Sequence, residues 1–460
     1  MTLHQISESE SDIIVGIDLG TTNSLISYFD GNTIQIVPDQ YNIDGIVPSV
    51  VAYTKDKTIV GTEALRIQNH IKSVKRLMNN SSSAISGDIT PITVSAEILK
   101  YLKCNIEKYL NIRVQKAVIT VPAHFDDNAR NAVKSAAEIA GLEVIRILNE
   151  PTAAAIAYGL NAELYDTMLV YDLGGGTFDV SILKTQNSII SVIATGGDNA
   201  LGGDDFDFEL LKLMCDKLQL SIDELLTQEN LYVASDCKKQ LSTQNIWHGI
   251  LGGYQISITQ DEANTVWHSL IIKTIKVVRE VLFASKLQPQ DIKHVILAGG
   301  GSKIPAVRHA IQHLFNIQPL DKIDPDIVVV IGAGLQAKAL AYGGHTLVDV
   351  VPLSLGIELL GNIIEQVIKR NTPIPAMVKK VYTTYRDNQT GFKIHIVQGE
   401  GDTVEKCKSL GEFKITGLTP KPAGDVRLEV VFKVDTNGLL IVTATELDSG
   451  QCCKIEIKAS

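Results

Sequence analysis

Two apolar stretches of the chain, at 13–19 and 168–173, end in the same way, in Asp-Leu-Gly followed by small residues. After each turn comes a second stretch in which apolar and polar residues alternate, at 24–29 and at 180–183. Two alternating apolar stretches joined by a tight polar turn predict a β-hairpin. The chain therefore contains the same predicted hairpin twice.

Around these hairpins the apolar positions switch between helical and strand-like spacing. Helices are predicted at 64–78, 94–110, 126–141, 208–226, 232–241 and 262–286, and buried strands at 116–121 and 294–298. Strands and helices in alternation predict a layered α/β domain. The run Gly332-Ala333-Gly334 has the spacing of a dinucleotide loop, but it falls within an apolar helix that Asp324 to Asp326 would cap. Close helix packing is the better interpretation.

From residue 350 onward the pattern is that of strands alone. Apolar runs occur at 380–385, 392–398, 411–415, 426–434, 439–445 and 454–458, and Asp435-Thr436-Asn437-Gly438 is typical of a hairpin turn. We expect one domain over 1–343, a linker over 344–351 and an all-β domain over 352–460.

Composition narrows the choice of partners. The 460 residues are 45% hydrophobic and 20% charged, and the formal net charge is −10. All of this net charge comes from residues 1–345, because residues 346–460 contain 14 basic and 14 acidic residues. No basic cluster alternates with aromatic residues, so we expect no nucleic-acid partner. No apolar run of membrane-spanning length is present, the first residues are not signal-like, and the six cysteines lack a CxxC pair. We expect a cytoplasmic protein that does not enter a membrane.

The repeated hairpin has a chemical meaning. Glycine lets the backbone approach a polyanion closely, and successive N–H groups in such a turn bind anions. An aspartate at the strand end can hold a hydrated cation against phosphate. A single Asp-Gly turn is usually only a turn, but two copies facing each other predict a nucleoside polyphosphate site. Taken alone, Lys75 would be a solvated lysine on a helix, and Glu150 could simply cap a helix.

Five longer segments of the chain have motifs that resemble those of a known protein family. The segments 16–24, 118–123, 149–155, 172–179 and 351–358 resemble a DnaK-type member of the 70-kDa heat-shock chaperone family. Gln5-Ile6-Ser7-Glu8 and the stretch 195–207 are similar to the HscA branch of that family, which is dedicated to iron–sulfur cluster assembly. The resemblance covers the whole chain.

The resemblance implies an actin-like ATPase domain of two lobes with a duplicated βββαβα core, followed by a β-sandwich that holds an extended peptide. It implies an ATP-dependent chaperone that binds ATP and ADP with Mg²⁺, with K⁺ as a second candidate ion. The implied partners are a J-domain co-chaperone and an iron–sulfur scaffold protein as client, and the chain would act as a monomer.

The resemblance also implies roles for individual residues. A role in hydrolysis is implied for Lys75, Glu150, Asp172, Thr177 and Asp179, with Lys75 in contact with the γ-phosphate. Binding of magnesium is implied for Asp18 and Asp172. Nucleotide binding is implied for Gly20, Thr21, Thr22, Asn23, Gly174, Gly175, Gly176, Gly202, Gly203, Lys238, Ser242, Gly299, Gly300, Ser302, Lys303 and Asp326. Coupling to the linker is implied for Pro122, Arg130 and Asp349. The peptide groove would be lined by Ile357, Leu360, Tyr382, Tyr385, Phe392, Ile394 and Ile396, although the isoleucines could equally be core residues.

Several departures from the family pattern create further expectations. The chain ends at Ser460 without the family's helical lid, so bound peptide should exchange fast. The linker at 346–349 has fewer leucines than the family's, which predicts weaker coupling between the domains. Lys303 replaces an arginine that stacks on adenine, and lysine stacks poorly. Phe392 and Tyr385 are bulkier than the family's residues, which predicts a shallower pocket.

Other functions remain open at this point. One is a general protein-folding chaperone of the same family, and another is a small-molecule kinase of the actin-like fold. The all-β domain and the lack of an evident acceptor base argue against the kinase. A third is a binding module that holds clients with little control by ATP.

Overall fold

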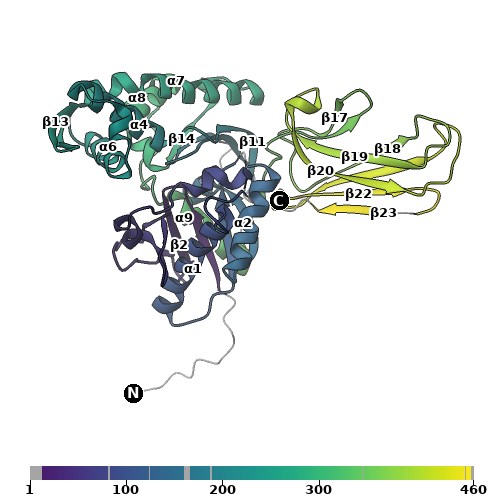
Figure 1. Cartoon of the computed structure of the whole chain (residues 1–460), viewed down its shortest axis with the longest axis horizontal. Coiled ribbons are helices and arrows are strands. Elements are labelled where there is room, and N and C mark those ends of the chain that lie inside the picture. The colour runs from purple at the N-terminus through teal and green to yellow at the C-terminus, as the bar shows by residue number, and fades with distance from the viewer. Residues whose placement is uncertain are drawn as a thin grey trace, which may run out of the picture.

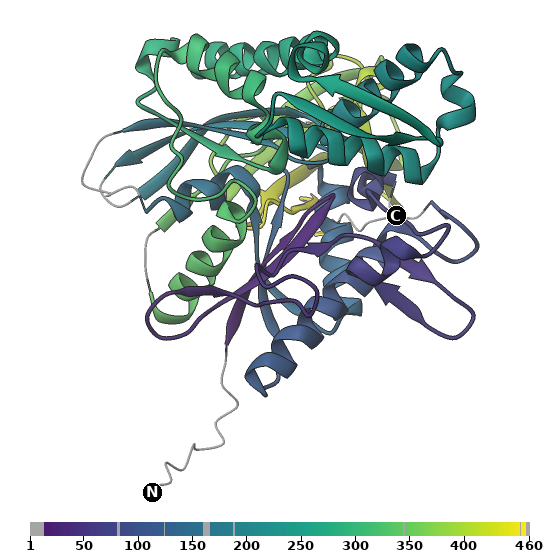
Figure 2. The same ribbon diagram turned by 90° about the vertical axis from the view of Figure 1, so that its left-hand side faces the viewer.

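The computed structural model describes residues 13–80, 83–123, 125–159, 166–186, 189–343, 346–450 and 452–456. The chain forms two α/β lobes, one above the other, and a β-sandwich beside them (Figures 1 and 2). The segment 5–8 and residues 344–345 of the predicted linker lie outside the described residues.

The first lobe is built on a sheet whose strands run in the order β3-β2-β1-β7-β8. These strands are β1 (Ile14–Leu19), β2 (Asn23–Phe29), β3 (Ile34–Ile36), β7 (Lys116–Val121) and β8 (Glu143–Asn149), with β4 (Val47–Pro48) paired to β2; β5 (Val51–Tyr53) and β6 (Thr58–Val60) form a small separate sheet. Helices α1 (Pro91–Leu110) and α2 (Asp127–Ile139) cover the sheet, and α3 (Glu150–Ala157) follows β8.

The second lobe repeats the arrangement. Its sheet runs β14-β9-β10-β11-β15, and its strands are β9 (Thr167–Leu173), β10 (Phe178–Gln186), β11 (Ile189–Asp198), β14 (His294–Ala298) and β15 (Thr346–Val348). In both lobes three antiparallel strands lead, through helices, to a strand that pairs in parallel with the first, so β9, β10, β11 and β14 correspond to β1, β2, β3 and β7. This is the predicted duplicated core, and both predicted hairpins are present.

Helices complete the second lobe. They are α4 (Gly203–Leu218), α5 (Ile222–Leu225), α6 (Gln228–Leu241), α7 (Gln260–Ser285) and α8 (Pro305–Phe315), with the hairpin β12 (Ile246–Leu251) and β13 (Tyr254–Thr259) and the short 3-10 turns η3 (Pro289–Asp291) and η4 (Gly300–Lys303). The helix that follows, α9 (Val328–Tyr342), returns to the first lobe and packs against β1, β2 and β7 (Figure 1). Among the described residues no helix is long and apolar enough to cross a membrane.

Close glycine contacts hold α9 against α3 and against β1. A Cβ atom on Gly332 would lie 1.8 Å from the carbonyl oxygen of Ala153 on α3, and one on Gly16 would lie 2.3 Å from the nitrogen of Gly334. Only glycine permits such close approach of two backbones. The prediction that Gly332 to Gly334 serve helix packing is confirmed.

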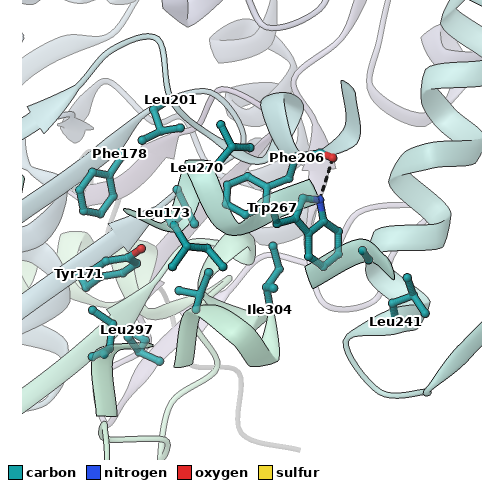
Figure 3. Close-up of a cluster of buried hydrophobic side chains, with 14 of the residues drawn as sticks. Tyr171, Leu173, Phe178, Leu201, Phe206, Leu241, Trp267, Leu270, Leu297 and Ile304 are labelled. Atoms are coloured by element: carbon teal, nitrogen blue, oxygen red, sulfur yellow. Dashed lines mark hydrogen bonds between the residues drawn. The ribbon is translucent and has the colours of Figure 1, made fainter. Parts of the chain in front are cut away.

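The core of the second lobe lies directly beneath the second hairpin. Tyr171 and Phe178 pack with ring centroids 4.7 Å apart, and Trp267 donates from Nε1 to the carbonyl oxygen of Phe206 over 3.0 Å (Figure 3). The buried Ile304 and Leu241 belong to the same cluster, from segments that border the cavity described below. Burial of this apolar cluster fixes the position of the hairpin tip.

The last part of the chain is a sandwich of two sheets. One has the order β17-β16-β19-β20 and the other β18-β21-β22-β23. The strands are β16 (Leu355–Leu359), β17 (Ile363–Ile368), β18 (Ala376–Thr383), β19 (Gly391–Gln398), β20 (Lys408–Thr416), β21 (Arg427–Val434), β22 (Leu440–Glu446) and β23 (Cys452–Glu456), with one 3-10 turn, η5 (Val404–Lys406).

The predicted helix at 64–78 is wrong. The structure has two 3-10 turns there, η1 (Gly61–Arg66) and η2 (Val74–Asn80), separated by an extended segment in which Ile71 bridges to Val51. Ser73 has a positive φ of 54°, which continuous helix does not allow. This irregular path buries Lys75, which a regular surface helix would have left in solvent.

Candidate functional site

The two hairpin tips meet across the gap between the lobes. A Cβ atom on Gly175 would lie 1.6 Å from Oγ1 of Thr22, and one on Gly176 would lie 2.4 Å from Cγ2 of Thr21. A larger residue at either position would clash with the first tip, so the second tip requires glycine there. The helix α4 is held to the same tip, because Gly203 N–H donates to the carbonyl oxygen of Gly174 over 2.9 Å.

A cavity of about 760 Å³ opens at this junction. Of the predicted nucleotide residues, Asp18, Gly20, Thr21, Thr22, Asn23, Lys75, Glu150, Asp172, Gly174, Gly175, Thr177, Gly203, Lys238, Ser242, Gly299, Gly300, Lys303 and Asp326 line it. The volume falls in the range of small-molecule sites. Residues more than 300 positions apart in sequence thus come together at one place.

Four predicted residues stand behind the cavity wall. Gly202 packs against the backbone of Gly176, and Ser302 is fully buried and donates to the carbonyl oxygen of Gly299 over 2.7 Å. Asp179 is also buried, and its Oδ1 accepts from the N–H of Ala123 over 2.7 Å. These residues shape the wall and do not line the cavity themselves.

One end of the cavity concentrates buried charge. Lys75 forms an ion pair with Glu150, and their side chains are 4% and 10% exposed. Burial raises the pKa of Glu150 to about 7, Lys75 lowers it, and Asp18 and Asp179 raise it. Burial, reinforced by the neighbouring carboxylates, also raises the pKa of Asp172 well above its usual range, and burial raises that of Asp18.

This donor set suits a hydrated divalent cation bound together with phosphate. Among the described residues no group of three metal-ligating side chains is close enough to hold a metal ion. Mutually repelling carboxylates beside an anion-binding tip need positive charge between them, and Mg²⁺ usually keeps several waters and bridges phosphate oxygens. The residues therefore fit Mg²⁺ held mostly through water and phosphate.

Another part of the cavity lining carries basic side chains. Lys303 pairs with Asp324 and Asp326 over 2.7 and 2.6 Å, so its ammonium group is already engaged. Arg308, on the following helix α8, lines the same cavity, and its guanidinium makes no hydrogen bond or ion pair with the part of the chain that the structure describes. Sequence reasoning missed Arg308, and also Ser235, Lys239 and His309, because no motif marks them.

Hydrogen bonds connect this site to the linker. Ala123, which follows the buried Pro122, bonds Asp179 through its N–H, and its carbonyl oxygen accepts from Nη2 of Arg130 over 3.2 Å. The same Nη2 donates to Oδ1 of Asn149 over 2.7 Å, and Nδ2 of Asn149 donates to Oδ2 of Asp349 over 2.5 Å. Asn149 immediately precedes Glu150 in the sequence, so one backbone segment touches both the cavity and the linker.

The linker and the sandwich contact both lobes. Strand β15 pairs in parallel with β11 at the edge of the second lobe, Thr346 opposite Ile189. On the first lobe, the turn 435–438 docks on β8 and α2: Ile147 N–H donates to Oδ1 of Asn437 over 3.0 Å, and Arg146 donates to the carbonyl oxygen of Thr436 over 3.0 Å. Lys408 also forms an ion pair with Asp126.

The residues predicted for the peptide groove divide by burial. Ile357, Ile394 and Ile396 belong to the buried core of the sandwich, and Tyr382 and Phe392 are partly buried against it. Leu360 and Tyr385 are exposed, at 75% and 55%. The OH of Tyr382 donates to Glu365 over 2.9 Å, a polar contact that the sequence did not predict.

The fold and the site together define a class: a two-lobed ATPase whose nucleotide cavity is connected through a linker to a β-sandwich. Comparison with known proteins agrees, because the Hsp70 protein family model matches residues 14–86 and 79–460. Proteins described as "Chaperone protein HscA homolog" from Polynucleobacter asymbioticus, Acinetobacter baumannii and Aliivibrio salmonicida are 40%, 42% and 41% identical over the whole chain, which spans 81% of each relative's length.

The chain belongs to the Hsp70 family. It is an ATP-dependent chaperone and an ATPase, and the predicted similarity to the HscA branch is confirmed. This membership favours the chaperone over the small-molecule kinase.

Proposed function

We propose that this chaperone hydrolyses ATP in the cavity between the lobes to control how the sandwich holds an extended segment of an iron–sulfur scaffold protein. The observation that carries the proposal is the unbroken set of contacts from Asp179 through Arg130 and Asn149 to Asp349. It connects the phosphate end of the cavity with the linker.

Hydrolysis of a phosphoanhydride depends mainly on positioning and on charge neutralisation. The hairpin tips at Gly20 to Asn23 and at Gly175 and Thr177 line the cavity and would present backbone N–H groups to the phosphates. Lys75 would place a positive charge where the terminal phosphoryl group develops charge. When bound, Mg²⁺ neutralises the phosphate oxygens, and Asp18 and Asp172 would hold it. Glu150, buried beside Lys75, orients the lysine and accepts a hydrogen bond from it.

The sandwich supplies the peptide site. An extended peptide gains main-chain hydrogen bonds from strand edges and apolar contacts from side chains, a mode that gives loose specificity. The exposed Leu360 and Tyr385 are apolar groups on the sandwich surface that a peptide could contact. Because Phe392 and Tyr385 are bulky, a compact segment that contains proline would fit best.

A J-domain co-chaperone, K⁺ as a second ion, a monomeric state and a place in the cytoplasm complete the proposal. Cys104, Cys215, Cys237 and Cys407 are free thiols, as expected in a reducing compartment. The HscA homologues among the relatives support the scaffold client over a general folding role.

The test is steady-state ATP hydrolysis by the whole chain with a scaffold peptide containing Pro-Pro, with a J-domain protein, and with both. The proposal expects both together to stimulate hydrolysis more than the product of the separate effects. A matched peptide in which alanine replaces both prolines should stimulate less. Hydrolysis that responds to neither partner while the peptide still binds would contradict the coupling.

A further inference from the structure

On the outer face of one sheet of the sandwich, three polar residues from three neighbouring strands form a hydrogen-bonded row. They are Glu358 on β16, His395 on β19 and Ser409 on β20. Residues 394 and 396 point into the core, so His395 between them points outward. No part of the nucleotide site or of the predicted groove uses this row.

The hydrogen bonds join the three side chains in the order of a catalytic triad: carboxylate, imidazole, hydroxyl. Nδ1 of His395 donates to Oε2 of Glu358 over 2.7 Å, which leaves Nε2 as the acceptor. Oγ of Ser409 lies 2.8 Å from that Nε2 and can donate its proton to it. A carboxylate that orients an imidazole, which in turn accepts the proton of a serine, is the arrangement that activates serine for acyl transfer.

The surroundings favour this chemistry. The side chain of His395 is only 13% exposed, whereas Ser409 is open to solvent. Glu412, which lies opposite His395 in the strand register, is paired with Lys393 over 2.7 Å, so the carboxylate that hydrogen-bonds to the imidazole is Glu358. Ser409 lies on β20, the edge strand of its sheet, so no further strand of that sheet follows beside it.

We propose that Ser409 is a nucleophile that takes an acyl group from activated esters, with His395 as its general base and Glu358 as the residue that positions His395. As Oγ bonds to the carbonyl carbon, its proton passes to Nε2 of His395. The bond from that carbon to the leaving oxygen then breaks, and the proton passes from Nε2 to the leaving oxygen. The products are acyl-Ser409 and the free alcohol, with no change of oxidation state.

The position gives the modification a consequence. The next residue toward the amino terminus, Lys408, forms the ion pair with Asp126 of the first lobe. An acyl group on Ser409 would therefore be attached to the same strand segment that contacts the ATPase domain.

The test exposes the whole chain to p-nitrophenyl acetate and follows acetylation of each serine by mass spectrometry after digestion. Ser221, which is exposed and whose hydroxyl accepts only a local backbone hydrogen bond from Asp223, is the internal reference. General-base activation predicts that Ser409 reacts at least about 100-fold faster than Ser221. H395Q should reduce this ratio to about one, and E358Q should reduce it at least about tenfold.

A purely structural hydrogen-bond row would leave Ser409 as unreactive as Ser221, and that result would overturn the proposal. Equal labelling of Ser409 before and after H395Q would overturn it as well. Thermal unfolding shows whether each variant is folded. If H395Q does not fold, the ratio of Ser409 to Ser221 in the unaltered chain still decides.

Discussion

At the scale of single residues, Lys75 is the clearest test of the nucleotide site. It is buried, paired with Glu150, and would lie at the terminal phosphate. We predict that K75A lowers the rate of ATP hydrolysis by about 10²- to 10³-fold, because one preorganised charge at the reacting group is lost. Single-turnover hydrolysis measures this. K72A is the matched control, since Lys72 is exposed in the same segment, and a similar loss in K72A would contradict the assignment.

Arg308 tests the basic part of the cavity lining. Lys303 is held by Asp324 and Asp326, so we expect Arg308 to supply the planar cation that contacts the base. R308A should weaken ADP binding by roughly 5- to 30-fold, which corresponds to 1 to 2 kcal/mol. Isothermal titration calorimetry gives the affinity. The exposed Arg279 provides the control variant R279A. Unchanged affinity in R308A would show that the guanidinium does not reach the nucleotide.

The sequence predicted residues of this site where a motif surrounds them, and missed them where packing alone brings them in. Asp18 and Asp172 end strands of a repeated hairpin, so their position follows from local pattern. Arg308 and His309 lie in an ordinary amphipathic helix that reaches the cavity only through tertiary packing. Burial of Ile394 and Ile396 in the sandwich was equally open from the sequence, because core and groove positions share the same alternation.

At the scale of elements, the turn 435–438 decides how the sandwich docks. The Asn437 side chain accepts the N–H of Ile147, which would otherwise lose its partner in a partly buried contact. We predict that N437A weakens docking of the sandwich by about 1–3 kcal/mol. Hydrogen exchange of the β8 amides in the presence of ATP measures how firmly the sandwich docks. N388A, in an exposed turn of the same sandwich, is the control. Unchanged protection in N437A would place the docking contact elsewhere.

The same contact predicts a dependence on pH. Asp127 on α2 is buried near Asp435 of the docked turn, and its Oδ2 has no hydrogen-bond partner among the described residues. Burial, opposed by Arg130 and reinforced by Asp126 and Asp435, raises the pKa of Asp127 from 3.8 to about 7. A raised carboxyl pKa means that the docked state holds the proton more tightly, so docking is favoured at low pH.

Docking should therefore weaken as the pH rises toward the docked pKa of about 7, by up to about tenfold per pH unit. D127N keeps the carboxyl site neutral and should remove this dependence, whereas D56N, at an exposed turn, should not. Docking is followed by fluorescence transfer between labels on the first lobe and on the sandwich. An identical pH profile for D127N and the unaltered chain would contradict the assignment.

Helices and strands are predicted correctly where a regular apolar pattern extends over many residues. The prediction is wrong for the irregular segment that carries Lys75. The helices α1, α2 and α7 and both hairpins have regular patterns and were predicted. The segment 61–80 is apolar at helical spacing, but Ile71 pairs with Val51 and Ser73 takes a positive φ, which bury Lys75. The sequence predicts a hairpin turn at 435–438. It does not predict the contact of this turn with the first lobe, because the two residues that form the contact are 290 positions apart in sequence.

At the scale of the whole molecule, the structure adds contacts between the domains that the expectation of weak coupling did not include. The short linker was predicted to bury little, yet β15 adds a strand to the second lobe and the sandwich contacts the first lobe through Asn437 and Lys408. Domain docking therefore rests on backbone pairing and polar contacts as well as on linker side chains. We propose that this arrangement transmits the state of the cavity to the sandwich through Arg130 and Asn149, which are joined by a hydrogen bond.

The measurement that tests this account most directly is the dissociation rate of a fluorescent scaffold peptide from the whole chain, after mixing with Mg·ATP or with Mg·ADP. We expect the peptide to be released at least about tenfold faster with ATP, which corresponds to the usual size of an allosteric coupling energy. N437A should reduce this difference. Equal release rates with ATP and ADP, in a chain shown to bind both, would mean that the ATPase domain and the sandwich work independently.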